Sequence, residues 1–215
     1  MGWECRGCKL CAFCGIENFL QNCSHRYLKI FLSMLIYMIG FQCAPAVMGI
    51  KVSNLVAVPR QKGAELDVVL DDYNQQFNAR GLFFFELCRC KARRMLFVYR
   101  KELLESYLRD HKNMAFLMGQ GYKPDMTLEE MLERLRERME ASNQFPHEIG
   151  IFLGYPLADV AYFMYHHGDH YEVCGEWKAY TNVSAAQYTF YRFELCRAQY
   201  QAQLLNGCTF SSLVA

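Results

Sequence analysis

Apolar residues recur with two different periods along this chain, and the shorter period marks strands. Residues 54–58 form a short β-branched run that ends at Pro59, which cannot donate a hydrogen bond to a neighbouring strand. Residues 82–88 and 94–100 are rich in aromatic side chains and are separated by a basic segment. This pattern is typical of two paired strands with a charged connection. We therefore predict a small sheet built from these three segments.

Spacings of three and four residues predict helices over most of the remaining chain. One apolar stripe runs through residues 64–79 and stops before Gly81, which suits a C-terminal cap. Shorter stripes mark residues 103–108 and 114–118. A longer stripe through residues 186–204 predicts a terminal helix that packs along the domain.

The clearest helix signal follows Thr127. Thr127 and Glu130 form a capping box, in which each side chain accepts a hydrogen bond from the backbone amide of the other residue. Further along, Gly154 and Pro156 predict that one helix stops and the next begins. We expect the charged residues of the capped helix to form a solvated face with ion pairs along the helix. These residues are Glu133, Arg134, Arg136, Glu137 and Arg138.

Together these elements predict an α+β fold, with a small β-sheet of about three strands packed with helices and a helix-rich C-terminal half. The chain has 215 residues, of which 53% are hydrophobic, so it can bury a substantial core. We assign residues 39–215 to a single domain. Residues 1–38 are a cysteine-rich and apolar extension that we treat as separate from the fold.

The formal net charge of +1 gives the chain no overall field that would concentrate nucleic acid or an anionic membrane. The basic run at residues 89–94 is a local patch, but connections between strands are commonly charged and solvated. Nucleic acid is therefore not expected as a partner. We expect a small ligand or another protein instead.

Residues 30–50 contain no charged side chain, and a run of this length is sufficient for a membrane span. Gly40, Gln42 and Pro45 interrupt its second half, which suits a buried helix or a signal segment equally well. We expect a cytoplasmic protein. Membrane anchoring through this N-terminal segment is the alternative.

Eleven cysteines in a chain of this size fit reduced thiols or metal ligands better than a disulfide framework. Cys5, Cys8, Cys11 and Cys14 are spaced so that their thiolates can converge on zinc or an iron–sulfur cluster. The usual ferredoxin run has three residues before its last cysteine and a proline after it, which this segment lacks. A non-functional extension is therefore the competing interpretation.

Three motifs carry a resemblance to a known family. They are Cys43-Ala-Pro45, Phe145-Pro-His-Glu-Ile-Gly150 and Gly175-Glu-Trp-Lys-Ala-Tyr180. They are similar to domain-of-unknown-function family 3793, an uncharacterised bacterial family found mostly in anaerobic Firmicutes. With this resemblance in mind, the candidate ligand-binding residues are His147, Glu148, Tyr155, Trp177, Lys178 and Tyr180. The candidate metal ligands are Cys43, His147, Cys174 and Cys196.

The chemistry of these residues supports two opposed interpretations. An imidazole titrates near neutral pH, so His147 suits a proton carrier or a metal ligand, and Lys178 and Trp177 can meet and stack on an anionic ligand. Alternatively, Glu148 only favours a helix N-terminus, His147 hydrogen-bonds within the core, and the cysteines are small buried hydrophobes.

Our leading hypothesis is a cytoplasmic accessory protein of anaerobic metabolism that binds a metal such as iron, haem or a small anionic ligand. The alternatives are a protein-interaction scaffold without catalysis, and an iron–sulfur electron-transfer protein that uses the N-terminal cysteines. The sequence has no G-x-S-x-G, Walker or H-E-x-x-H motif, so enzyme status stays open.

Overall fold

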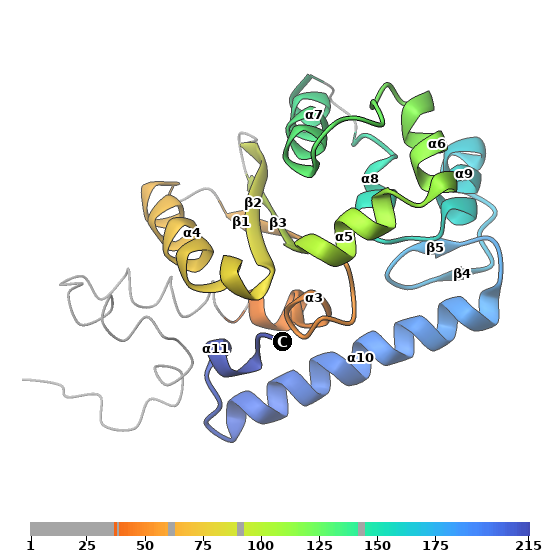
Figure 1. Ribbon diagram of the computed structural model, residues 1–215. Helices are drawn as coiled ribbons and strands as arrows, with labels where there is room; N and C mark the ends of the chain where they lie inside the picture. The colour runs from red at the N-terminus through yellow and green to blue at the C-terminus, as the bar shows by residue number, and fades with distance from the viewer. Residues whose placement is uncertain (1–36, 38, 60–62, 90–92, 142–144) are drawn as a thin grey trace, which may run out of the picture.

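A three-stranded antiparallel sheet forms the centre of the molecule (Figure 1). The computed structural model describes residues 37, 39–59, 63–89, 93–141 and 145–215. The strands are β1 (Ser53–Pro59), β2 (Leu82–Arg89) and β3 (Arg93–Arg100), in the order β1-β3-β2. All three predicted strands and the pairing of the second with the third are confirmed.

Helices make up most of the rest, so the α+β prediction is confirmed. They are α3 (Ala44–Val47), α4 (Gly63–Phe77), η3 (Asn78–Arg80, a 3-10 turn), α5 (Lys101–Leu108), α6 (His111–Gly119), α7 (Leu128–Ala141), α8 (Ile149–Phe152), α9 (Leu157–His166), α10 (Val183–Leu205) and α11 (Phe210–Leu213). A two-stranded hairpin, β4 (Val173–Cys174) and β5 (Lys178–Ala179), joins α9 to α10. Gly81 follows η3 with a φ of +74°, a left-handed conformation that suits glycine at a cap.

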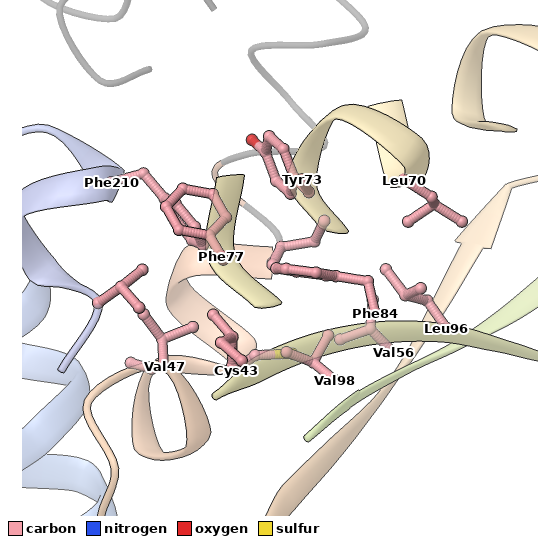
Figure 2. Packing of buried hydrophobic residues seen from close by; sticks show 14 of the residues in the cluster. Cys43, Val47, Val56, Leu70, Tyr73, Phe77, Phe84, Leu96, Val98 and Phe210 are labelled. Atoms are coloured by element: carbon pink, nitrogen blue, oxygen red, sulfur yellow. The ribbon is translucent and has the colours of Figure 1, made fainter. Parts of the chain in front are cut away.

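Successive strand residues point to opposite faces of a sheet, and both faces of this sheet are covered. The first face packs against α3 and α4, and residues of α10 and α11 complete the same core, part of which Figure 2 shows. Tyr73 of α4 lies 5.1 Å from the ring of Phe84 and 5.4 Å from the ring of Phe210. Each large side chain buried in this way stabilises the fold by about 1.5–3 kcal/mol.

The second face of the sheet carries a separate core formed with the helices between β3 and the hairpin. Phe97 and Tyr99 of β3 pack there with Leu104 of α5, Leu132 of α7 and Phe152 of α8. The second half of the chain thus covers this face, as predicted. The first face is covered by α3 and α4, which come from the first half of the chain. The sheet therefore lies between two helical layers.

The capping box at the start of α7 forms as predicted. The backbone N–H of Thr127 donates to Glu130 Oε2 at 2.7 Å, and the N–H of Glu130 donates to Thr127 Oγ1 at 3.2 Å. The predicted ion pairing along α7 is confirmed for Glu133 and Arg136. The prediction of a solvated face is wrong for Arg138, which forms an ion pair with the buried Glu148. Arg134 and Arg136 also lie 5.7 Å and 5.2 Å from the ring centres of Tyr122 and Phe85.

One arginine of the basic run at residues 89–94 is buried and paired within the fold. Arg94 is buried and forms ion pairs with Glu86 and Asp67, with its Nη2 2.6 Å from Glu86 Oε2. Residues 90–92 of this segment lie outside the described residues. The expectation about nucleic acid stays a prediction.

Among the described residues, no helix is both long enough and apolar enough to cross a membrane. Of the uncharged run at residues 30–50, the structure describes residue 37 and residues 39–50. Ile39 and Cys43 in this part are buried in the core on the first face of the sheet. The helical conformation is interrupted at Cys43, after which Pro45 lies in the first turn of α3.

Candidate functional site

A pocket of about 360 Å³ opens between the turn that joins α8 to α9 and the β4–β5 hairpin. These elements lie together at one end of the molecule (Figure 1). Four aromatic rings line it, from Phe145, Tyr155, Phe163 and Trp177. Polar side chains at its walls are His147, Asp159, Cys174, Glu176 and Lys178. At about 30 Å³ for each molecule, the volume corresponds to about a dozen waters.

The turn between α8 and α9 brings one wall into place because small residues allow close packing. A Cβ atom on Gly150 would lie 2.7 Å from a methyl group of Val160, so only glycine lets α8 approach α9 without a shift. Gly154 then adopts a φ of +75°, and Pro156 is the N-cap of α9. Tyr155, held between them, donates its N–H to the carbonyl of Gly150 at 2.9 Å.

Asp159, in the first turn of α9, fixes the hairpin that forms the opposite wall. Its Oδ2 accepts the indole N–H of Trp177 at 2.8 Å. Its Oδ1 accepts the backbone N–H groups of Tyr180 and Thr181 and the hydroxyl of Thr181, each at 2.9 Å. The carboxylate is 2% exposed, so these four donors satisfy a charge that would otherwise be costly to bury.

Trp177 is held on three sides. Its ring lies 5.2 Å from that of Tyr155 and 4.6 Å from that of Phe190 on α10, in addition to the bond with Asp159. A Cβ atom on Gly175 would lie 2.4 Å from the ring of Phe190, so this glycine is what lets the hairpin turn rest on α10. The indole is therefore a rigid wall of the pocket.

Lys178 closes the hairpin against the loop after α9. Its Nζ donates to the carbonyl of Gly168 at 2.7 Å and lies 4.7 Å from the ring centre of Tyr171. An ammonium group has three N–H donors. The bond to Gly168 uses one of them, so the cation can still serve a ligand in the pocket.

Glu176 links the pocket to a buried group of charges. It accepts from Lys51 Nζ at 3.3 Å and pairs with Arg197 of α10. Burial lowers the pKa of Lys51, and the nearby Glu176 partly offsets this effect. Lys51 Nζ also lies 5.2 Å from the ring centre of Tyr155, and burial raises the pKa of that phenol.

His147 and Glu148 have different neighbours, although both line a second pocket of about 380 Å³ beside the first one. His147 is exposed, lines the pocket, and lies edge-to-face with Phe163 at 5.4 Å. Glu148 is the N-cap of α8, is 1% exposed, and pairs with Arg138, with the hydroxyl of Tyr122 3.4 Å away. Glu148 thus lies at the N-terminus of α8, but its carboxylate makes no capping hydrogen bond and pairs with Arg138 instead, and His147 is not buried within the core.

Tyr180 stands apart from the pocket. Its ring is stacked 5.9 Å from His166 and 6.0 Å from Tyr162, on the outer side of α9. Of the six candidate ligand-binding residues, His147, Tyr155, Trp177 and Lys178 line the pocket.

The four candidate metal ligands are divided between two places. His147 and Cys174 line the same pocket, whereas Cys43 and Cys196 are buried in the core on the first face of the sheet. In the part of the chain that the structure describes, no three His, Cys, Asp or Glu side chains gather as a metal site. Cys5, Cys8, Cys11 and Cys14 lie outside the described residues, so their proposed metal site stays a prediction.

The cysteines differ in redox state and reactivity. Cys43, Cys174, Cys196 and Cys208 are free thiols, whereas Cys88 is disulfide-bonded, so the expectation of reduced thiols does not extend to it. Burial raises the pKa of Cys43 to about 12. Because the thiolate is the nucleophile, Cys43 is expected to be unreactive near neutral pH.

We therefore expect iodoacetamide to modify the exposed Cys174 rapidly in the folded protein and to leave Cys43 unmodified. Unfolding in urea should make both thiols react at similar rates. Peptide mass spectrometry at timed intervals measures both rates in one sample. Equal rates for the two thiols in the folded protein would contradict the burial described for Cys43.

Sequence reasoning missed the pocket residues Asp159, Phe163 and Glu176. It also missed the two cations that pair with Glu176, which are Lys51 and Arg197. Asp159 had one usable signal, because an acidic residue in the first turn after Pro156 favours a helix N-terminus. That signal explains why an acidic residue occurs in the first turn of α9. It does not predict that the carboxylate binds the β4–β5 hairpin. Lys51 and Arg197 are 146 positions apart and share a partner only after folding.

The comparison with curated proteins and the comparison with solved structures each find no significant match. A family model described as "Protein of unknown function (DUF3793)" matches residues 39–214. This match contains all three motifs on which the sequence resemblance rests and every described residue that lines the pocket. The chain therefore belongs to the DUF3793 family of proteins of unknown function.

Proposed function

We propose that this protein binds a small molecule with a planar, largely apolar body and an anionic group, in the pocket between the α8–α9 turn and the β4–β5 hairpin. The observation that carries the proposal is the pocket itself, with four aromatic rings around about 360 Å³ and a few polar groups at its walls. Sites for small molecules are typically concave and apolar, with a small number of placed polar groups.

The charges around the pocket favour an anion. Lys178 lines it, and Lys51 and Arg197 lie behind Glu176. With Lys51 protonated, these three cations face two carboxylates, Glu176 and Asp159, which leaves one positive charge. Asp159 is saturated by four donors, so Lys178 is the charge best able to respond to a ligand.

Stacking would supply most of the affinity. Trp177 and Tyr155 present rigid rings that need no ordering when a ligand binds, because their positions are already fixed by neighbours. His147 at the rim is suited to donate a hydrogen bond to the ligand or accept one from it. The size of the pocket favours a ligand of one or two fused rings over haem.

A protein-interaction scaffold is the second candidate, and a specific observation favours it. Gly175, Trp177 and Lys178 are each engaged by neighbours within the chain, which is what residues that only hold the fold would show. The metal-binding and iron–sulfur hypotheses are supported by the cysteine and histidine content of the sequence. A cytoplasmic setting and a link to anaerobic metabolism are supported by the cysteines and the family resemblance, and both stay proposals.

The test begins with protein purified anaerobically, followed by metal analysis and native mass spectrometry for a co-purified ligand. Planar aromatic carboxylates, with 2-naphthoate as the first probe, are then titrated by ligand-observed NMR. We expect saturable binding that His147→Ala weakens about 2- to 10-fold, the value of one hydrogen bond. Lys178→Met should weaken it about 10- to 100-fold, since it removes a charged donor.

The matched control is His111→Ala, which removes another exposed imidazole on α6, away from the pocket. It should leave binding and melting temperature unchanged. His147→Ala should also keep its melting temperature within about 2 °C, because an exposed side chain contributes little to stability. Failure of all probes to bind, combined with a much lower melting temperature for His147→Ala, would support the scaffold instead.

A further inference from the structure

Helix α10 carries two apolar stripes on opposite sides. The buried stripe packs into the core and consists of Ala186, Phe193, Cys196, Tyr200 and Leu204. The second stripe is exposed and consists of Tyr188, Tyr191, Leu195, Ala198, Ala202 and Leu205. At about 100° per residue, the two stripes point in nearly opposite directions.

The second stripe is unusually exposed for its apolar content. The exposed fractions are 64% for Tyr188, 56% for Tyr191, 42% for Leu195 and 62% for Leu205. In Figure 1, α10 runs along the lower edge of the molecule from the β4–β5 hairpin to α11. A continuous apolar stripe on the exposed side of a helix is typical of a surface that binds a partner.

The spacing of this stripe identifies the geometry of its partner. Its six positions are separated by three, four, three, four and three residues, which is the a and d pattern of a coiled-coil seam. A strict seven-residue repeat turns slowly around a straight helix, so two such seams meet by supercoiling around each other. The surface therefore fits another helix rather than a membrane or a small molecule.

We propose that α10 pairs antiparallel with α10 of a second copy of this chain. In the register that the seam favours, Leu195 lies opposite Ala198 of the partner subunit. Tyr191 then lies opposite Ala202 of the partner subunit, and Tyr188 lies opposite Leu205 of the partner subunit. Leu195 and Tyr191 thus each meet an alanine, which allows close packing across the middle of the seam, and Tyr188 meets Leu205 at each end.

A parallel arrangement would pack poorly. Each seam position would face its own copy, so Ala198 and Ala202 would face small residues and leave space between the helices. Tyr188 and Tyr191 would face equally bulky rings at the other end and hold the helices apart there. The unequal sizes along this one stripe therefore select the antiparallel orientation.

The residues beside the seam are compatible with this pairing. The flanking positions on its two sides carry glutamine or asparagine except at Arg192 and Glu194. In the antiparallel register Arg192 comes closest to Gln199 of the partner subunit, and Glu194 to Gln201 of the partner subunit. No like charges meet, so we expect the association to depend only weakly on salt.

The available area indicates a modest affinity. The seam from residue 188 to residue 205 is about 25 Å long. Its two half-exposed tyrosines each offer roughly 100–150 Å². With the leucines, the alanines and the stems of the flanking glutamines, the total reaches the lower part of the range around 800 Å² for each partner. Interfaces of this size are often weak, so we expect a Kd in the micromolar range.

Sedimentation velocity of the full chain from about 1 to 300 µM tests the dimer across the expected Kd. We expect Leu195→Glu to weaken association at least about 100-fold, because it places a charge at the centre of the seam. Tyr165→Glu is the control, since Tyr165 is 78% exposed on α9 and lies outside the seam. A monomer at every concentration, or a dimer that Leu195→Glu leaves intact, would overturn the proposal.

Disulfide trapping tests the register. Protein with Tyr191→Cys is mixed with protein with Ala202→Cys, and the linked peptides are identified by mass spectrometry after mild oxidation. We expect links between positions 191 and 202 of different copies. Two copies of position 191 lie about 16 Å apart along the axis in this register, so they should not link. Links between identical positions would overturn the antiparallel arrangement.

Discussion

Replacing Asp159 with alanine is expected to lower the free energy of unfolding by about 3–4 kcal/mol, because four donors lose their shared acceptor. The indole N–H of Trp177 and the backbone of Tyr180 and Thr181 would be left without this partner. The β4–β5 hairpin should therefore loosen before the rest of the fold. Urea unfolding measures the stability, and amide exchange at Tyr180 and Thr181 reports on the hairpin.

Asp169→Ala is the control for this prediction, because it removes an exposed carboxylate from the loop between α9 and the hairpin. It should change stability by less than about 0.5 kcal/mol. If Asp159→Ala is as mild as Asp169→Ala, the carboxylate of Asp159 does not hold the pocket wall.

The second large effect is expected for Arg138→Ala, which should destabilise the protein by about 2–4 kcal/mol. Glu148 is 1% exposed, so removing Arg138 leaves a buried carboxylate without its ion-pair partner. Arg136→Ala is the matched comparison on the same helix. The exposed fractions of the Arg138 and Arg136 side chains are 36% and 38%, but the carboxylate paired with Arg136, that of Glu133, is 46% exposed.

We expect Arg136→Ala to cost under about 1 kcal/mol, from a weak exposed ion pair and its contact with Phe85. The double variant Arg138→Ala with Glu148→Gln should recover part of the loss, because it removes the buried charge. Equal costs for Arg138→Ala and Arg136→Ala in urea unfolding would show that burial of Glu148 does not matter.

The contrast between these two arginines explains how far the sequence could predict the fold. Strands, helices and caps depend on neighbours within a few positions, so the patterns around Pro59, Gly81 and Thr127 were sufficient to place them. Arg136 and Arg138 have similar neighbours along the chain. They differ in what lies across from α7, which local patterns do not report.

The candidate site was predictable to the extent that it lies in motifs. His147, Trp177 and Lys178 were found because two motifs contain them, and the structure places all three at one pocket. Glu176 lies inside a motif, but its role depends on Lys51 and Arg197, which are far away in the sequence. Asp159 acts through its bonds to the hairpin, which the local signal after Pro156 does not predict. Glu148 was selected with His147 because the two are adjacent, yet Glu148 is buried against Arg138 whereas His147 is exposed beside Phe163.

Helix α10 shows a third limit. The apolar stripe from Ala186 to Leu204 was recognised because its residues recur at helical spacing. The second, exposed stripe from Tyr188 to Leu205 was equally regular, but a sequence does not show which of two apolar sides of a helix faces the core. Once the structure shows which side is buried, the exposed stripe can be proposed as an interface.

The most direct measurement of the ligand-binding claim is an NMR titration that observes the indole N–H of Trp177. The chain has two tryptophans, so Trp177→Phe assigns the signal without ambiguity. We predict that 2-naphthoate shifts this resonance saturably with a Kd below about 1 mM. In Cys174→Phe, which adds a ring at the exposed edge of the pocket but no indole, the shift should be lost. An indole signal that stays unchanged in the wild-type protein, or that shifts equally in Cys174→Phe, would contradict binding in this pocket.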